Sequence, residues 1–268
     1  SRQIAALSAG NIAALSPSQI AALSAAGIAG MAAEQIAALS TAQVGALTSV
    51  QIGALGSSQI AALDVDDIGT FTAAELAAIS SSAVPGLSTA IVATLTTTQM
   101  NALGAAVMPG LTTNQIAAFS TAQVSALATA QIAALTSKQV AALNTAAIAS
   151  LSVTQVAALD AKAIAGLTST QAAALSVEQV QAFSVRQIGA MTSDALKGLS
   201  VEMLATFSTE ELAAIGSSAI KGLSTGFIAS LSTSRVAALG TAGIAGMTSD
   251  QVSALRTDQI EALSTGQI

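Results

Sequence analysis

Hydrophobic and polar residues follow one another along this chain in a pattern of eight positions, which repeats from Ser8 to Ser264 without an insertion or deletion. The unit reads S-x-x-Q-I-A-A-L, as in residues 16–23. Numbered from its serine as position 0, each octad has Ile, Val, Leu or Met at position 4, with Ala172 as the one small exception, and Leu, Ile, Met or Phe at position 7. A spacing of three residues places positions 4 and 7 on one face of a helix but on opposite faces of a strand. The pattern therefore predicts helix, which the frequent alanines at positions 5 and 6 also favour.

The start of each octad has the residue types of a helix N-cap. Position 0 is Ser, Thr, Asp or Asn in 26 of 33 octads, and the short side-chain oxygens of these residues accept a free backbone N–H. Gln is the commonest residue at position 3, where it completes a capping box. One continuous helix is the main alternative, but a period of eight needs about 4 residues per turn where a helix has about 3.6, so its apolar stripe would drift. Each octad is therefore predicted to be a separate helix of one to two turns.

Two prolines interrupt this pattern. Pro85 and Pro109 both stand at position 5 of their octads. Proline inside a helix removes a hydrogen bond and collides with the preceding turn. These two octads are expected to end early or to form a looser turn.

Position 6 indicates how the helices are arranged. It is Ala, Gly, Ser or Thr in every octad, which indicates that another part of the structure packs closely against it. The octads that lack Ala at position 6 also lack Gln and Glu at position 3. Some of them have Gly at position 6 and the others have Thr or Ser. Within each of these two kinds, successive octads are separated by three, four or seven octads. A screw with roughly 3.3 to 3.5 octads per turn leaves such spacings along one side. The predicted fold is an all-α solenoid, a superhelix of short capped helices that runs through residues 1–268 as part of a longer array.

The modified position 6 suggests a self-association stripe, because small residues allow another backbone to approach closely. The alternative is that glycine only relaxes a tight turn next to an octad without Gln. The stripe comprises Gly30, Thr70, Gly86, Thr94, Gly110, Ser150, Gly166, Gly198, Thr206, Gly222, Ser230 and Gly246.

The composition excludes several functions. The chain has no His, Cys, Trp or Tyr, 8% charged residues and a net charge of −6. Serine and threonine have no histidine or cysteine partner, so we expect no enzyme, no catalytic residue and no cofactor. The absence of a basic block and of stacking aromatic residues argues against nucleic-acid binding. The Ser or Thr in each octad interrupts every apolar run, so no membrane span is expected.

One acidic cluster is a candidate metal site. Asp64, Asp66 and Asp67, with Glu75, could offer carboxylate oxygens to Ca²⁺. The alternative is a capping aspartate followed by acids in the first helical turn, where the helix dipole favours them. We prefer that alternative and assign no metal site.

Two further groups of side chains have a possible role. Lys197 and Lys221, which stand at position 5 of octads three apart, could pair with acids on a neighbouring turn, although exposed pairs contribute little. Rows of hydroxyl residues such as Thr96-Thr97, Thr112-Thr113 and Ser120-Thr121 could bind ice or a polysaccharide. Helix capping explains the same rows without any ligand.

Runs such as QIAALSTAQVGAL and TTNQIAAFSTAQVSAL resemble the Ala-rich octad tracts of very large repetitive secreted proteins of Gram-negative bacteria, which are often associated with type I export. The resemblance covers the whole chain. It implies an extracellular or cell-surface stalk, sheath, filament or adhesin whose partner is a further copy of itself, and it carries over no functional residue. Two alternatives are a repeat module that binds ice or a glycan and a designed repeat without a natural partner.

Overall fold

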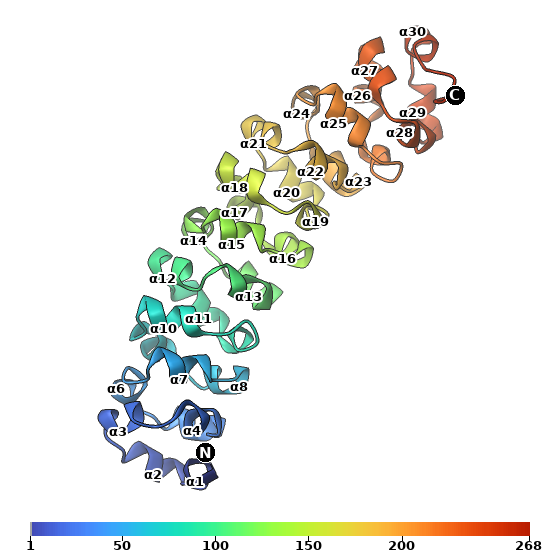
Figure 1. Cartoon of the computed structure of the whole chain (residues 1–268). Coiled ribbons are helices and arrows are strands. Elements are labelled where there is room, and N and C mark those ends of the chain that lie inside the picture. The colour runs from blue at the N-terminus through green and yellow to red at the C-terminus, as the bar shows by residue number, and fades with distance from the viewer. Residues whose placement is uncertain (1) are drawn as a thin grey trace. The chain divides into compact units, whose positions relative to one another are not determined.

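The computed structural model describes residues 2–268, and the chain divides into two compact units, Ser1–Ala134 and Leu135–Ile268. Both units consist of short helices joined by bends, and residues 2–268 contain no strand (Figure 1). Most octads form one α-helix of four to six residues, and none of these helices continues into the next octad. The prediction of an all-α solenoid of separate short helices is confirmed.

The helices of the first unit begin at position 1 of their octads, except for α1 and one of the two 3-10 helices, η1. They are α1 (Arg2–Ala5), α2 (Ala9–Ala13), α3 (Pro17–Ala21), α4 (Ala25–Ala29), α5 (Ala33–Ala37), α6 (Thr41–Val44), α7 (Ser49–Gly53), α8 (Ser57–Ile60), α9 (Val65–Gly69), α10 (Ala73–Ala78), η1 (Val84–Gly86), α11 (Thr89–Thr94), α12 (Thr97–Ala102), η2 (Ala105–Gly110), α13 (Thr113–Ala117), α14 (Thr121–Ala126) and α15 (Thr129–Ala133). Helix α1 is described from position 2 of its octad onward.

The second unit repeats this arrangement with one 3-10 helix. Its helices are α16 (Ser137–Ala142), α17 (Thr145–Ala149), α18 (Val153–Ala158), α19 (Ala161–Ile164), α20 (Ser169–Ala173), α21 (Val177–Gln181), α22 (Val185–Gly189), α23 (Ser193–Gly198), α24 (Val201–Ala205), α25 (Thr209–Ala214), η3 (Ile220–Gly222), α26 (Thr225–Ser230), α27 (Thr233–Ala238), α28 (Thr241–Ala245), α29 (Ser249–Ser253) and α30 (Thr257–Glu261).

Helix α20 shows why each octad begins a helix. Thr168 is the N-cap, with extended backbone angles, and its hydroxyl oxygen accepts the backbone N–H of Gln171 at 3.3 Å. The carboxamide oxygen of Gln171 accepts the N–H of Thr168 at 2.9 Å and so completes the predicted capping box. Octads without a capping hydroxyl keep half of this arrangement, since Gln35 still accepts the N–H of Ala32 at 2.7 Å.

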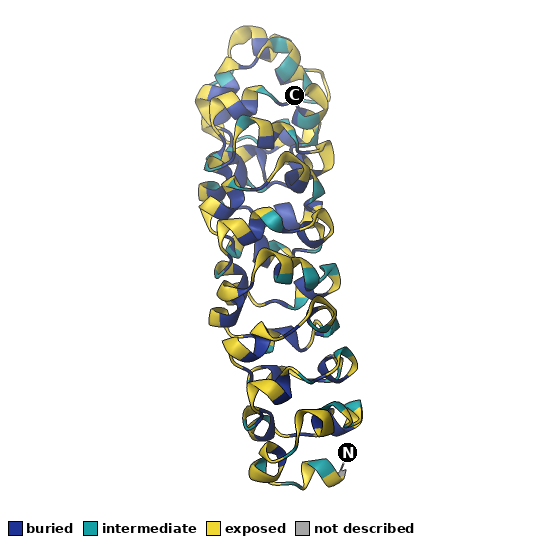
Figure 2. Cartoon of the chain, turned by 90° about the vertical axis from the view of Figure 1, so that its left-hand side faces the viewer, coloured by how far each residue is buried: buried dark blue, intermediate teal, exposed yellow. Residues whose placement is uncertain are grey.

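The interior of each unit is built from positions 4 and 7. In the first unit Ile52 and Leu55 are buried, and in the second unit Val156 and Leu159 are buried at the same positions. Figure 2 shows buried residues on the inner side of the ribbon and exposed residues on its outer side. A buried aliphatic side chain contributes about 1.5 to 3 kcal/mol. Two such residues per octad hold together helices that are too short to be stable alone.

The helices of each unit wind with between three and four octads per turn. Helix α7 packs on α4, and α23 packs on α20, which in both cases is the helix three octads earlier. Side chains of position 3 reach backbone that lies four octads earlier, as Gln51 does with Leu23. The contacts with helices three octads earlier and with backbone four octads earlier bracket the predicted value of roughly 3.3 to 3.5 octads per turn.

The octads of Pro85 and Pro109 depart from the α-helix, as predicted. They form the 3-10 helices η1 and η2, and Pro109 lies inside η2. A third 3-10 helix, η3, contains no proline and was not predicted. No helix within residues 2–268 is long and apolar enough to cross a membrane.

Candidate functional site: the contacts between turns

The glutamines at position 3 join each turn to the one before it. Gln171 is buried, and its Nε2 donates to the backbone oxygens of Val140 at 2.8 Å and Leu143 at 2.6 Å. These acceptors lie 31 and 28 residues earlier in the chain. Because Oε1 of the same side chain caps its own helix, one carboxamide both starts a helix and fixes it to the preceding turn.

This bond recurs throughout both units with the same spacing. In the first unit the donors are Gln35, Gln43, Gln51, Gln59, Gln115, Gln123 and Gln131. In the second unit the donors include Gln171, Gln179, Gln187, Gln251, Gln259 and Gln267.

The glycines at position 6 form a second contact between turns. A Cβ added to Gly198 would overlap the carbonyl oxygen of Ser169 and lie 2.8 Å from its carbonyl carbon. The same collision with the carbonyl of a serine at position 1, three octads earlier, occurs at Gly86, Gly110, Gly166, Gly222 and Gly246. All seven glycines at position 6, Gly30 included, have a serine at this place in the sequence. The absence of a side chain therefore allows two turns of the same chain to approach closely.

The hydroxyl residues at position 6 have a local role. Thr70 donates its side-chain O–H to the carbonyl oxygen of Asp67 at 2.7 Å, and Ser150 donates to that of Ala147 at 2.8 Å. Thr94, Thr206 and Ser230 do the same to the residue three before each of them. In these octads the hydroxyl satisfies a backbone acceptor at the end of its own helix.

All residues of the proposed self-association stripe except Gly30 thus have described contacts inside the chain. The predicted close approach of another backbone is confirmed for six of the glycines, and that backbone belongs to the chain itself. The backbone does not support the alternative that the glycines at position 6 relax a tight turn. Within residues 2–268 the one residue with a positive φ is Gly104, which stands at position 0. Contact of the stripe with a second copy stays a prediction. A large side chain at Gly198 would disturb the fold itself, so it cannot test that prediction alone.

Four octads have a charged residue in place of the glutamine. Arg235 keeps the bond between turns, because its guanidinium donates to the carbonyl oxygens of Leu204 and Phe207, both at 3.1 Å. Glu75 and Glu211 accept the N–H of their own N-cap residues at 2.7 Å, but an ionised carboxylate has no proton to donate. In the fourth octad Asp67 is 8% exposed, and its burial raises the pKa of its carboxyl group, as do the charges of the neighbouring aspartates.

The candidate calcium ligands do not gather into a metal site. No group of three or more His, Cys, Asp or Glu side chains within residues 2–268 is placed to hold a metal ion. Asp64 caps α9, since its carboxylate accepts the N–H of Asp67 at 2.9 Å. Asp66 and Asp67 lie in the first turn of that helix, as the preferred alternative predicts.

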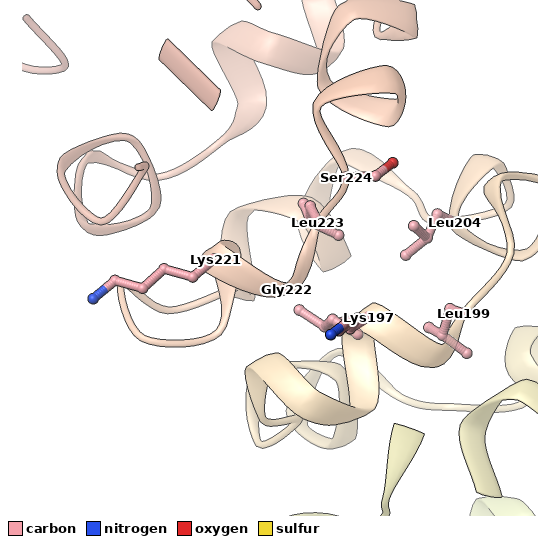
Figure 3. Close-up of a pocket in the computed structure, with 8 residues that line it drawn as sticks. Lys197, Leu199, Leu204, Lys221, Gly222, Leu223 and Ser224 are labelled. Atoms are coloured by element: carbon pink, nitrogen blue, oxygen red, sulfur yellow. The ribbon is translucent and has the colours of Figure 1, made fainter. Parts of the chain in front are cut away.

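Lys197 and Lys221 line a cavity of about 340 Å³ together with several leucines and Gly222. Lys221 extends away from Leu199 and Leu204 (Figure 3). The ion pair found within residues 2–268 joins Arg256 and Asp258 at 3.0 Å, so neither lysine forms the predicted pair with an acid.

The position-0 members of the hydroxyl rows cap helices. The side-chain oxygens of Thr96, Thr112 and Ser120 each accept the backbone N–H of the glutamine three residues later, at 3.2 Å. Capping therefore accounts for these hydroxyls, as the alternative without a ligand predicts.

The double role of Gln was missed from the sequence, although the sequence contains a signal for it. A capping box accepts Glu and Gln equally well, yet position 3 is Gln far more often than Glu. Gln differs from Glu in having donor hydrogens. The preference therefore indicates that a donor is needed at this position.

Comparison with known families agrees with this description. The family model of the ALTTAQ repeat matches residues 17–49, 28–65, 41–73, 108–137 and 228–265. The six letters of its name correspond to positions 6 and 7 of one octad and positions 0 to 3 of the next, as in Ala38–Gln43. They cover the junction that contains the cap and the glutamine. No curated protein matches the chain. The chain is a helical repeat protein.

Proposed function

We propose that this chain is a structural module of an extended extracellular filament, sheath or adhesin stalk of a bacterium, which grows by adding turn upon turn. The observation that supports this proposal is that the same contacts between turns recur throughout each unit, so that further turns can be added without a new kind of contact. A protein of this kind has a structural role and needs no catalytic group.

The last octads of the second unit expose residues that other turns bury. Val252 and Ile260 stand at position 4 and are 48% and 45% exposed, whereas Val140 and Ile148 at the same position are fully buried or nearly so. A cavity of about 460 Å³ lies here, lined by Ile244, Met247, Val252, Leu255, Ile260 and Leu263 among others. A further turn of the same kind would bury this apolar area, as later turns bury Val140 and Ile148.

The first octads of the first unit expose the complementary groups. Asn11 and Gln19 stand at position 3 and cap their own helices, but they are exposed and donate to no earlier turn within the described part of the chain. Leu15 and Leu23 at position 7 are only half-buried. Carboxamide donors and leucines are the groups that each turn presents to the one before it. A preceding turn, from the same array or from a second copy, would satisfy both.

An extracellular place for this module follows from the resemblance to secreted octad proteins of Gram-negative bacteria. A long structural element on a cell surface needs a unit that can be repeated many times and that resists unfolding. The repetition of the same contacts from each turn to the next agrees with that role.

The proposal predicts end-to-end association of the purified chain. Its mass in light scattering should rise with concentration, and electron micrographs should show rods longer than one chain. Val252→Glu with Ile260→Glu should abolish both effects, because the charges would be buried in the new contact. Val50→Glu and Val153→Glu are the matched controls, since these valines are 71% and 46% exposed away from the ends. A chain that stays monomeric at every concentration, or association that survives the end substitutions, would contradict the proposal.

A further inference from the structure

One cavity of the second unit combines an apolar lining with two lysines. It lies where α23 packs on η3, and its volume is about 340 Å³. Four leucines line it, together with Lys197, Lys221, Gly222 and Ser224. Sites for small molecules have volumes of about 300–1,000 Å³ and a mostly apolar lining with a few polar groups. The size and the lining of this cavity agree with such a site.

The charged groups that line this cavity are all positive. Its lining contains Lys197 and Lys221 but no carboxylate. The acid of α23, Asp194, lines a different cavity, and its Oδ2 accepts the N–H of Ser169 at 2.9 Å. Within residues 2–268 no ion pair involves either lysine. Two like charges beside one cavity repel each other, so an anion between them would be stabilised.

The repeat itself does not account for these lysines. Position 5 is Lys in these two octads alone, and no other octad has Lys or Arg there. The dipole of a helix favours a base near its C-terminus. The other helices have the same dipole and yet no base at position 5. The pair is therefore a feature of this one place in the chain.

A second cavity of the same unit shows this place without the lysine pair. Its volume is about 440 Å³, and Ala141 and Ala165 line it at the positions that correspond to Lys197 and Lys221. The two charged residues of its lining have opposite signs. A cavity at this place thus belongs to the repeat, whereas a purely positive lining belongs to the cavity of the two lysines.

We propose that the cavity of Lys197 and Lys221 binds a small alkyl carboxylate. The carboxylate would lie between the two ammonium groups, and the alkyl chain would lie against the leucines. Figure 3 shows Lys221 extending away from Leu199 and Leu204. A lysine has a flexible four-carbon stem with three donor hydrogens at its end, so rotation about the stem would bring this ammonium group over the cavity.

Ser224 provides a further donor to the carboxylate. Its Oγ accepts the backbone N–H of Phe227 at 3.1 Å, as the N-cap of α26. A hydroxyl that accepts one hydrogen bond can still donate its own hydrogen. The site therefore offers donors alone to the charged end of the ligand.

Acetylation of the lysines with an activated acetate ester, followed by peptide mass spectrometry, tests this site in the full chain. The chain has four lysines, so Lys138 and Lys162 serve as internal references for Lys197 and Lys221. Sodium hexanoate should slow acetylation of Lys197 and Lys221 several-fold and in a saturable way, because an ammonium group bound to a carboxylate loses its proton less readily. Hexanol, which lacks the charge, and acetate, which lacks the chain, should protect much less.

Lys197→Gln should abolish the protection of Lys221, because one ammonium group would hold the carboxylate too weakly. Lys162→Gln is the matched control, since Lys162 is exposed and lines neither cavity. Circular dichroism would check that both variants retain their helices. The proposal is overturned if hexanoate protects all four lysines alike or none of them, if hexanol or acetate protects as well, or if Lys221 stays protected in a folded Lys197→Gln variant.

This test is independent of end-to-end association. The cavity at the last octads of the second unit is lined by neither lysine. Hexanoate bound there would leave the acetylation of Lys197 and Lys221 unchanged, so failure of this site and failure of the proposed function are distinguishable.

Discussion

Gly198→Ala is expected to destabilise the second unit by about 3 kcal/mol, because the added methyl group collides with backbone and not with a movable side chain. The Cβ would overlap the carbonyl oxygen of Ser169, which belongs to the preceding turn. Relief would require α20 and α23 to separate, and this would weaken the burial of both helices. Urea unfolding followed by circular dichroism measures the change.

Gly226→Ala is the matched control in the same unit. Gly226 lies near the start of α26, and a Cβ there would come no closer than 4.0 Å to the Ser224 hydroxyl. Alanine is favoured over glycine within a helix, so this variant should gain about 0.5 to 1 kcal/mol. Equal effects of the two substitutions would show that Gly198 is not a contact between turns.

Gln171→Glu is expected to cost about 3 kcal/mol at neutral pH, since a buried donor is replaced by a charged acceptor of the same shape. The glutamate can still accept the N–H of Thr168, as Glu75 does with Thr72. It loses the bonds to Val140 and Leu143 and places negative charge against their oxygens. Protonation at low pH should restore part of the lost stability, because a neutral carboxyl group can donate. Urea unfolding at neutral and at acidic pH measures both effects.

Gln19→Glu separates the two roles of the glutamine. Gln19 is exposed and accepts the N–H of Ser16 at 2.7 Å, with no bond to an earlier turn among the described residues. Its replacement should change the stability by no more than about 0.5 kcal/mol. If Gln19→Glu and Gln171→Glu had the same effect, the glutamines would act only as caps.

Much of the local structure could be predicted from the sequence, because it depends on neighbouring residues. The N-caps, the helix breaks and the looser turns at Pro85 and Pro109 all follow from contacts within one octad. The number of octads per turn could be predicted from the spacing of unusual octads. By contrast, η3 contains Lys221 where the other two 3-10 helices have proline, and no proline signal marks it.

The contacts between turns were harder to predict because their partners lie 28 to 31 residues apart. The small residues at position 6 correctly indicated a close neighbour, but they did not reveal whether that neighbour belonged to the same chain. The pairing of each such glycine with a serine at position 1, three octads earlier, does contain this information. This pairing can be recognised only when the number of octads per turn is known, because a serine at position 1 is otherwise an ordinary first-turn residue.

The most direct measurement of the winding is a disulfide between successive turns. The chain contains no cysteine, and a Cβ placed at Gly53 would lie 3.8 Å from the Cβ of Ala78, a separation that suits a disulfide. Gly53→Cys with Ala78→Cys should therefore form an intramolecular disulfide on mild oxidation. Gly53→Cys with Gly69→Cys is the control, because a Cβ at Gly69 meets no atom within 4 Å. In an unbroken helix the first pair would lie roughly 37 Å apart, so failure of that pair to link, or linkage only between chains, would contradict the wound array of separate helices.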